Sequence, residues 1–313
     1  MFSFKSIHEF NQHFDSELSC YNFLEKLWWS DGIYCPHCGS IKQPYKVASR
    51  TKMKDAPTYR CSEKECQLPF TIKTGSIFDG THIELMKWFH AIYEISINKK
   101  GISSLLLSEK INVSQKTAWL MIHKIRTKLF NDQPEMLDGI VEIDETFVGG
   151  KNKNRHKDKK VEKSRGRSFK DKTPVLGMIN DEGKVRLFVV PDTSANSIVP
   201  ILVRNIRPHS EVCTDEWGAY NSISHYFNHY VVDHGRKQYS NCGMTTNRIE
   251  NFWGLFKRGL VGIYNSVSRK HLQRYCSEFE FRFNNRDKEQ CERFLLTLDK
   301  FDKPPITYKK LTA

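Results

Sequence analysis

The sequence has no long hydrophobic run. Nowhere do about 18 apolar residues follow one another, so no membrane-spanning helix is expected. The first residues, MFSFKSIHEFNQHF, lack the apolar core of a secretory signal, so export by such a signal is not expected either. Internal repeats are also missing, which argues against a repeat architecture. Hydrophobic residues at 39% and aromatic residues at 12% fit a folded soluble protein.

The chain has a large excess of basic residues. Its 313 residues suffice for two or three domains, and 49 Lys and Arg against 36 Asp and Glu give a net charge of +13. Residues 151–172 carry 11 basic and 3 acidic side chains, so this stretch alone has a net charge of +8. Such a basic patch is typical of proteins that bind nucleic acid, and the alternative is a solvated loop.

The cysteines indicate a metal site. Nine cysteines, an odd number in a long chain without a secretory signal, favour reduced thiols over a disulfide framework. Cys35 and Cys38 form a C-x2-C pair, and Cys61 and Cys66 form a C-x4-C pair. Zn²⁺ prefers four sulfur or nitrogen ligands, and Gly39 suits the tight turn after the first pair because glycine accepts a positive φ. The pattern predicts a zinc ribbon with one structural Zn²⁺, and the alternative is four unconnected buried thiols.

Three segments follow one another along the chain. Residues 1–81 contain one or two short helices and the zinc ribbon, and residues 82–135 are helical. Residues 136–313 show strands and helices in an order that suits a mixed sheet with helices on its faces, interrupted by the basic insertion 151–172. The expected fold is therefore a multidomain α+β chain that ends in an α/β domain.

The helical segment has the spacing of a helix-turn-helix. A short helix in ISSLLLSEKI precedes a turn around Asn112 and Val113, and a second helix starts at Ser114 or Gln115. We expect this second helix to present basic side chains to DNA. They are Lys116, His123, Lys124, Arg126 and Lys128. A plain helical hairpin is the alternative.

The stretch GIVEIDETFVGGK, residues 139–151, places three carboxylates in a strand whose other residues are typical of a buried one. Burying an unpaired carboxylate costs several kcal/mol, so such acids are usually paired, protonated or bound to a metal. Asp144 has possible partners in Asp215, at the end of another strand, and Glu250, on a helix. Together these three would hold two Mg²⁺ or Mn²⁺ ions for phosphoryl transfer. The alternative is an ordinary set of strand-end and helix-surface acids.

Side-chain periodicity orients the residues around these three acids. Glu142 shares a strand face with Asp144, whereas Glu145 points to the other face, and both are expected to be solvated at the exposed end of the strand. On the helix, residues spaced i, i+3, i+7 and i+10 share one face. They are Asn247, Glu250, Gly254 and Lys257. Lys257 is thus placed to hold a DNA phosphate near the metals.

Nine motifs extend over nearly the whole chain: WWSDGIYCPHCGS, YRC with FTIKTGSIFDGT, KWFHAIY, KKGIS, VSQKTAWLMIHKIR, VEIDETFVGGK, TDEWGAY, TNRIENFWGLFKRG and PPITYKKL. With this set the sequence resembles the DDE transposases of bacterial insertion sequences, in the group related to the eukaryotic Merlin elements. The set is specific, although no single motif is. The resemblance implies a ribonuclease-H-like catalytic domain, preceded by a zinc ribbon and a helical region that bind the terminal inverted repeats of the element.

The resemblance also implies roles for single residues. Asp144 in DET matches the first catalytic acid of the family, and Asp215 in TDEW matches the second. Glu250, with Lys257 seven residues later, fits the third position as Glu-x6-Lys. Asn247 is the rival, because some members of the group have Asn in the third place.

Further residues are expected to line the site or to contact DNA. His234, in VVDHG, stands where a family histidine often precedes the third acid, and the alternative is a histidine satisfied at a strand end. Outside the helix-turn-helix, the expected DNA contacts come from the last acid-bearing helix and from the basic insertion. They are Lys257, Arg258, Lys151, Lys153 and Arg155.

The expected reaction is Mg²⁺-dependent cleavage at the element ends, followed by attack of the freed 3′-hydroxyl on target DNA. Both ends must be handled together, so at least a dimer is expected on DNA, at the nucleoid of a bacterial host or in the nucleus of a eukaryotic one. Two alternatives remain. One is a zinc-ribbon DNA-binding regulator with an inactive nuclease domain, and the other is a ribonuclease-H-type nuclease that cuts without strand transfer.

Overall fold

The chain folds into two compact units. A computed structural model describes residues 2–48, 56–129, 135–149, 156–160, 172–232, 240, 243–302 and 311. The first unit comprises the residues up to Leu129 together with those from Asp287 onward, and the second comprises the residues between them. The sequence-based division placed the last residues with the C-terminal domain, and the structure instead groups them with the N-terminal unit. Within the described ranges, no helix is both long and apolar enough to cross a membrane.

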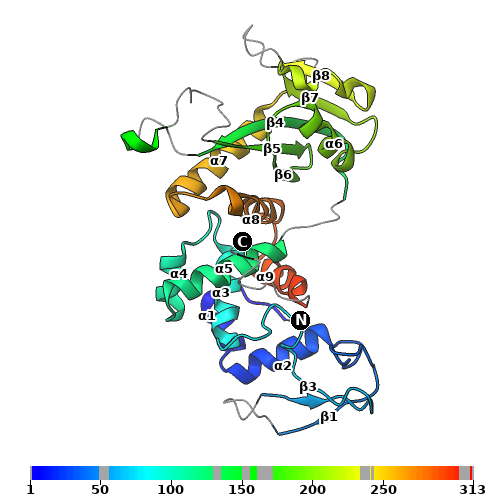
Figure 1. The fold of residues 1–313 in the computed structure, drawn as a ribbon, viewed down its shortest axis with the longest axis vertical. Coiled ribbons are helices and arrows are strands. Elements are labelled where there is room, and N and C mark those ends of the chain that lie inside the picture. The colour runs from blue at the N-terminus through cyan, green and yellow to red at the C-terminus, as the bar shows by residue number, and fades with distance from the viewer. Residues whose placement is uncertain are drawn as a thin grey trace. The chain divides into compact units, whose positions relative to one another are not determined.

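The first unit combines a small antiparallel sheet with six helices in its described part (Figure 1). Its elements are α1 (Ile7–His13), α2 (Glu17–Trp28), β1 (Tyr45–Lys46), β2 (Tyr59–Arg60), β3 (Pro69–Phe70), α3 (Leu85–Ile97), α4 (Ser104–Ile111), α5 (Gln115–Leu129) and α9 (Gln290–Leu298). The three strands pair in the order β1-β2-β3. The helices agree with the sequence expectation, including the break before α5.

Helix α9 belongs to the first unit because of an aromatic core. The Phe294 ring on α9 lies 5.3 Å from the ring of Phe10, 5.7 Å from that of Phe89 and 5.7 Å from that of Phe4. All four side chains are at most 1% exposed. Burying a phenylalanine stabilises a fold by about 1.5–3 kcal/mol, so these contacts join the two ends of the chain.

The second unit is built on a five-stranded mixed sheet. Its strands are β4 (Ile140–Val148), β5 (Thr173–Asn180), β6 (Val185–Val189), β7 (Glu211–Asp215) and β8 (Asn228–Val232). Their spatial order is β6-β5-β4-β7-β8. Strand β5 is antiparallel to β4 and to β6, whereas β4, β7 and β8 run parallel. This is the mixed sheet expected for a ribonuclease-H-like domain.

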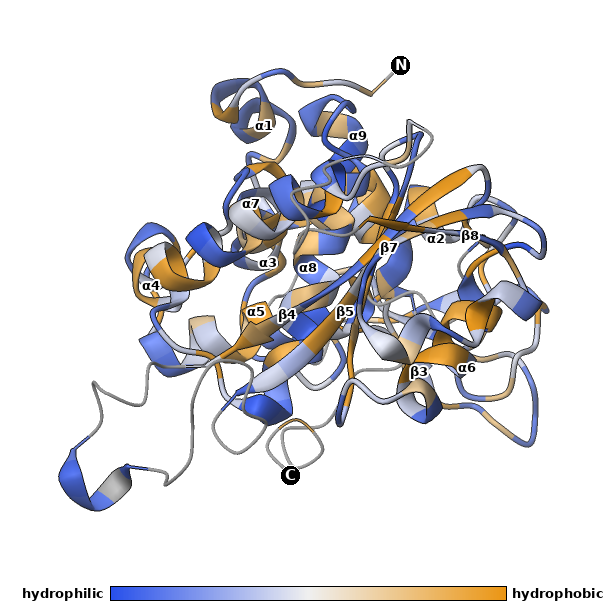
Figure 2. Ribbon diagram, turned by 90° about the horizontal axis from the view of Figure 1, so that it is seen from above, coloured by the Kyte–Doolittle hydropathy of each residue, from blue (hydrophilic) through white to orange (hydrophobic). Residues whose placement is uncertain are grey.

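Helices cover both faces of the sheet (Figure 1). They are α6 (Ala195–Asn205), α7 (Asn247–Tyr264) and α8 (Leu272–Asn284). Val141 and Ile143 of β4 belong to the core that includes Ile198 and Leu202 of α6. The core on the other face joins β5 and β6 to α7 and α8. Figure 2 shows both hydrophilic and hydrophobic residues on α6, as expected for a helix with one side against a sheet.

One glycine sets how closely α7 approaches the sheet. Gly177 of β5 lies opposite Asp144 of β4 in the register. A Cβ at Gly177 would lie 2.5 Å from Cζ2 of Trp253 and 2.9 Å from Cδ1 of Ile249. Both side chains belong to α7 and are buried, so neither has room to move away. Helix α7 therefore packs directly on the backbone of β5 beside Asp144.

We predict that Gly177→Ala destabilises the protein by about 1–3 kcal/mol, because the added methyl group overpacks the contact with Trp253. Equilibrium denaturation followed by tryptophan fluorescence measures the change. Gly262→Ala is the matched control. Gly262 is on α7, the helix that carries Trp253, and a Cβ there meets nothing within 4 Å. That variant should keep or raise stability, by up to about 1 kcal/mol. Equal stability of the two variants would contradict the close approach.

Candidate metal centre and active site

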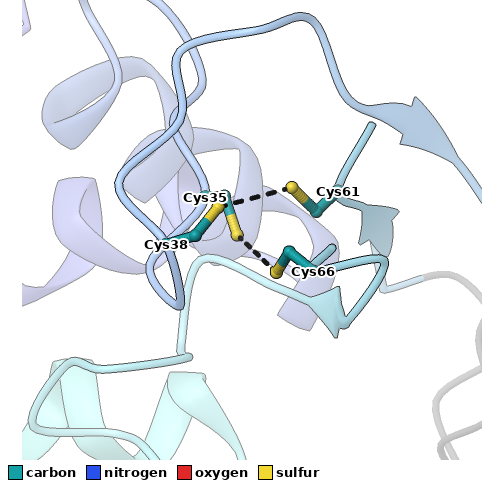
Figure 3. Close-up of side chains that lie close together, drawn as sticks. All are labelled: Cys35, Cys38, Cys61 and Cys66. Carbon is teal, nitrogen blue, oxygen red and sulfur yellow. Dashed lines mark hydrogen bonds between the residues drawn. The ribbon is translucent and has the colours of Figure 1, made fainter. Parts of the chain in front are cut away.

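Four cysteines meet beside the small sheet of the first unit, in the turns and loops that flank its strands (Figure 3). The Sγ atoms of Cys35 and Cys66 are 3.8 Å apart, and those of Cys38 and Cys61 are 3.6 Å apart. All four lie within 4.8 Å of one another. A tetrahedron with Zn–S bonds of ~2.3 Å has sulfurs roughly 3.8 Å apart, so the cluster fits a structural Zn²⁺. The predicted four-cysteine site is confirmed as a cluster of the right size and donor type.

The backbone around the cysteines is shaped for this site. Gly39 has a φ of +74° and donates its N–H to the carbonyl of Cys35 at 2.8 Å, so the expected turn glycine is confirmed. Gln67, directly after Cys66, occupies a similar left-handed position with a φ of +47°. The N–H of Glu63 donates to Cys61 Sγ at 3.4 Å, and such donors favour the thiolate that binds metal.

Burial acts to raise the pKa of Cys35, but hydrogen bonds from the N–H groups of Cys38 and His37 and from the thiols of Cys38 and Cys61 act to lower it, and the net pKa is lowered. Cys35 is thereby prepared to bind as a thiolate. The His37 side chain itself is exposed, and its Nε2 lies 3.3 Å from the carbonyl of Pro69. His37 is therefore engaged with the Pro69 carbonyl and is not part of the group of four possible ligands.

Helices α4 and α5 are joined by three residues, as the sequence predicts. Asn112 adopts a left-handed conformation with a φ of +49°. Ser114 caps α5, because its Oγ accepts the N–H of Thr117 at 3.2 Å. A 2.6 Å ion pair between Lys110 and Glu94 fixes α4 to α3. The three helices thus form a compact group with a tight turn between the second and the third.

The basic residues of α5 differ in accessibility. Lys116, in the first turn, is exposed. Lys124 lies over the ring of Trp88 at 5.9 Å, and burial lowers its pKa. Arg126 is only 2% exposed, and its Nη1 lies 3.3 Å from Nε2 of the buried His123. The expectation that Arg126 is presented to DNA is therefore corrected, because the buried stripe of α5 is wide enough to include it.

In the second unit, Asp144 and Asp215 lie on neighbouring parallel strands. Ile140 pairs with Glu211 and Glu142 pairs with Cys213, so residue numbers differ by 71 across the pair. Continued by two residues, this register sets Asp144 level with Asp215, and residues level in parallel strands share a sheet face. Both side chains are partly exposed.

Two further carboxylates of β4 are buried, against the expectation that they are solvated. Glu142 is 1% exposed and Glu145 is 8% exposed. Each contacts an element from elsewhere in the second unit, one on either face of the sheet. The reason is that the apolar strand around them lies between two helical layers, so neither side chain reaches water.

Glu142 caps helix α7. Its Oε2 accepts the N–H of Arg248 at 2.7 Å and that of Ile249 at 3.1 Å. Its Oε1 accepts the hydroxyl of Thr245 at 3.4 Å and lies 3.6 Å from Nε of Arg248. Burial raises the pKa of Glu142, while the N–H groups of Ile249 and Arg248 act to lower it. A negative charge at a helix N-terminus is stabilising, so Glu142 ties α7 to β4.

Glu145 fixes the segment that follows Asp215. The hydroxyl of Tyr220, in the short 3₁₀ helix η3 (Gly218–Tyr220), donates to Glu145 Oε1. Tyr220 is 1% exposed, and its pKa is raised well above its usual value by burial, by Glu145, by Asp144 and by Asp215. Asp215 itself accepts the N–H of Trp217 at 3.1 Å. Tyr220 thus joins Glu145 of β4 to the segment that follows β7.

The two candidates for the third acid lie in the first turn of α7. Glu250 and Asn247 are both exposed, and Glu250 Oε1 accepts the hydroxyl of Thr246 at 3.2 Å. Lys257 and Arg258 are exposed further along the helix. Among the described residues, only the four cysteines have ligand atoms all within 4.8 Å of one another, so the three acids are less closely gathered.

Four residues expected at the site or on DNA lie outside the described residues. They are His234, Lys151, Lys153 and Arg155. They remain predictions.

Comparison with known proteins identifies the family. The ISXO2-like transposase domain matches residues 136–284, and the transposase zinc-ribbon domain matches residues 15–68. An uncharacterized protein in the transposable element ISH50 of Halobacterium salinarum is 30% identical over 302 residues, which is 91% of this chain and 97% of that protein. The chain belongs to the IS1595 family of DDE transposases. An uncharacterized transposase-like protein of Haemophilus influenzae is 33% identical over 103 residues, 33% of this chain and 82% of that protein.

The family domains agree with the structural units. The zinc-ribbon domain includes all four clustered cysteines, and the DDE transposase domain ends at Asn284, the last residue of α8. Helix α9 lies beyond the matched domain, in agreement with its packing in the N-terminal unit. The second unit of this transposase is thus the enzymatic DDE domain.

We predict that Cys38→Ser lowers the zinc content of the purified transposase, because a serine hydroxyl is a poor replacement for a thiolate ligand. Metal analysis by mass spectrometry measures the stoichiometry. His37→Ala is the matched control, since this neighbour is not part of the four-cysteine group, and it should keep one zinc per chain. A Cys38→Ser protein with full zinc would remove Cys38 from the ligand set.

We predict that Glu142→Ala loosens the first turn of α7, because the N–H groups of Arg248 and Ile249 lose their acceptor. The expected cost is about 2 kcal/mol, and Glu142→Gln, which keeps an acceptor oxygen, should lose less. Amide hydrogen exchange of a peptide from this turn measures the effect. Protection in α8 is the internal control, and Glu182→Ala, at an exposed acid of the β5–β6 turn, is the control variant. Wild-type protection of α7 in Glu142→Ala would refute the capping role.

Proposed function

We propose that this transposase binds the terminal inverted repeats of its element and catalyses metal-dependent strand cleavage followed by strand transfer. Asp144, Asp215 and Glu250 would hold the catalytic ions. The observation that carries the proposal is the strand register, which sets Asp144 level with Asp215 at the face where α7 is capped. Carboxylate oxygens are the donors that Mg²⁺ and Mn²⁺ prefer, so the residues fit the ions.

When bound, two such ions would activate the attacking hydroxyl and stabilise the leaving oxygen of the phosphodiester. The residues of this chain supply the rest. Glu142 holds α7 against β4, and Tyr220 links Glu145 to the segment after Asp215. The acids are thereby pre-positioned on rigid elements, which is what a phosphoryl-transfer site requires.

The third position is assigned to Glu250 over Asn247. A carboxylate brings a negative charge and two oxygens to a divalent ion, whereas an amide brings one neutral oxygen. The Glu250 carboxylate also turns back toward the start of α7, where it accepts the hydroxyl of the buried Thr246. This orientation supports Glu250 as the residue that faces the capped end of the helix.

DNA contacts are proposed for both units. In the N-terminal unit, the zinc ribbon and the exposed Lys116 at the start of α5 would read the element end, since the first turn of a recognition helix contacts base edges. Lys257 and Arg258 on α7 would hold phosphates, together with Lys151, Lys153 and Arg155 of the basic insertion. His234 is proposed to line the site. A dimer on two element ends, the Merlin relationship and action at the nucleoid or in a nucleus stay predictions.

We predict that Asp215→Asn abolishes strand cleavage and leaves DNA binding nearly intact, because the amide cannot replace a carboxylate that binds a divalent ion. The assay uses DNA that carries the flanking ends of the element, with Mg²⁺ and with EDTA. Wild-type protein should cleave and join in Mg²⁺ alone. Cleavage by Asp215→Asn at the wild-type rate would reject the assignment of the acids.

The same assay separates the alternatives. Glu250→Gln should behave as Asp215→Asn does, whereas Asn247→Ala should retain metal-dependent cleavage; the reverse result would assign Asn247. Nicking of any DNA without joining would favour a nuclease that lacks strand transfer. Binding of the ends without any cleavage would favour a regulator with an inactive nuclease domain.

A further inference from the structure

A cleft of about 540 Å³ opens in the second unit, on the flank of α7 next to the face that carries Glu250. One wall is a stripe of α7 at spacing i, i+3, i+7 and i+10, formed by Arg248, Asn251, Leu255 and Arg258. The other wall is the β5–β6 turn, residues 181–183. The cleft closes at Phe283, in the last turn of α8, and at Arg286, just after that helix. Three arginines from two separate segments therefore line one cleft.

Each guanidinium is held in place by a neighbour. Arg286 Nη1 donates to the carbonyl of Gly183 at 3.0 Å and to that of Phe283 at 2.8 Å, and its guanidinium stacks 4.4 Å from the Phe283 ring centroid. Arg248 lies beside the buried Glu142. Arg258 folds back over Gly254, where a Cβ would meet its Nη1 at 3.4 Å. Arginines that are already oriented lose less side-chain entropy when they bind a ligand.

We infer that this cleft holds the phosphodiester backbone of one DNA strand next to the active site. The planar fork of a guanidinium matches the oxygens of a phosphate, and Arg is preferred wherever such bidentate recognition matters. Arg248 and Arg258 are ten residues apart on the helix, or about 15 Å along its axis. That span is longer than one phosphate group, so the two guanidiniums would contact different phosphates of the same strand.

The shape of the cleft favours a polymer over a small anion. Arg248 and Arg258 stand at different turns of the helix, too far apart to enclose one phosphate. Between them the wall is Leu255 above the buried Phe252, an apolar strip that suits sugar groups. Arg248 stands in the first turn of α7, as Glu250 does, and Asn251 of the same wall lies about 100° around the helix from Glu250, so a strand along this wall runs beside the face that carries the proposed third acid.

The carboxylates of the opposite wall make the two sides of the cleft differ in charge. Asp181 turns toward the start of β4, where a Cβ at Gly139 would meet its Oδ1 at 2.8 Å. Glu182 is exposed on the rim. Three guanidiniums against two carboxylates leave the cleft with a net charge of +1, concentrated on the side of α7 and Arg286. The strand is therefore expected on that side, with Glu182 opposing it.

The test is the salt dependence of binding to a duplex that carries one element end. Arg286→Gln should reduce the slope of log affinity against log salt by about 1, the value for one lost phosphate contact. Arg286→Lys keeps the charge and should keep the slope. Glu182→Gln should tighten binding, because a repulsive charge is lost. Arg204→Gln is the matched control: this exposed arginine is on α6, which packs on the other face of the sheet, and its slope should equal that of the wild type.

Two results would overturn the inference. One is an Arg286→Gln slope equal to that of the wild type and of Arg204→Gln. The other is an equal loss of slope in Arg286→Gln and Arg286→Lys, which would trace the loss to the contacts with Gly183 and Phe283 and not to charge. The inference rests on the proposed function, but the two fail separately. Cleavage by Asp215→Asn rejects the acids, whereas an unchanged salt slope in Arg286→Gln, with Asp215→Asn inactive, rejects only the cleft.

Discussion

The active-site half of the molecule depends on one buried carboxylate. Glu142, in the middle of the sheet, accepts two backbone N–H groups from the first turn of α7, whose own N-cap residue makes no side-chain cap. A carboxylate buried without partners would cost several kcal/mol, but here it meets the positive end of a helix and the guanidinium of Arg248. Charge-assisted bonds of this kind are stronger and more directional than apolar contacts. They fix the position of the first turn of α7 relative to β4, and hence the position of Glu250, which lies in that turn.

Side chains on alternate faces of strand β4 contact two different elements, α7 on one face and the segment after β7 on the other. Glu142 and Asp144 share the face of α7, and Glu145 turns to the other face, where it accepts the hydroxyl of Tyr220. Tyr220 follows Asp215 by only five residues, so this bond restrains the segment directly after β7. Three acids within four positions thus have three separate tasks. Two are structural contacts to the elements that carry the other candidate ligands, and Asp144 between them is the acid proposed to bind the catalytic ions.

Much of this could be predicted from the sequence, because ligand spacing and hydrophobic period are local signals. The cysteine pairs could be predicted from their spacing and a turn glycine, and the break between α4 and α5 could be predicted from its turn residues. Burial across a tertiary contact is not local. Arg126 is a basic residue of the kind that contacts DNA, but it lies in the buried stripe of α5. Helix α9 joins the N-terminal unit through aromatic rings such as that of Phe4, which is almost the whole chain away in sequence. The acids of β4 could have been predicted to have polar partners, because an unpaired carboxylate in a buried apolar strand is costly. The sequence of the strand alone does not identify those partners.

The N-terminal unit uses the same device. Helix α3 begins without a side-chain cap of its own, and Glu17 of α2 accepts the N–H groups of Leu85 at 2.7 Å and Met86 at 2.9 Å. Helix α2 in turn meets the zinc ribbon through Glu25, which accepts the hydroxyl of Tyr59 at 3.0 Å. The zinc ribbon is therefore connected through α2 to the group of α3, α4 and α5 by carboxylate hydrogen bonds. These bonds are directional and would be lost if the elements shifted against each other. In both units a glutamate at a foreign helix N-terminus sets the spacing between elements that act together, and a small apolar core could not define that spacing as sharply because its contacts are not directional.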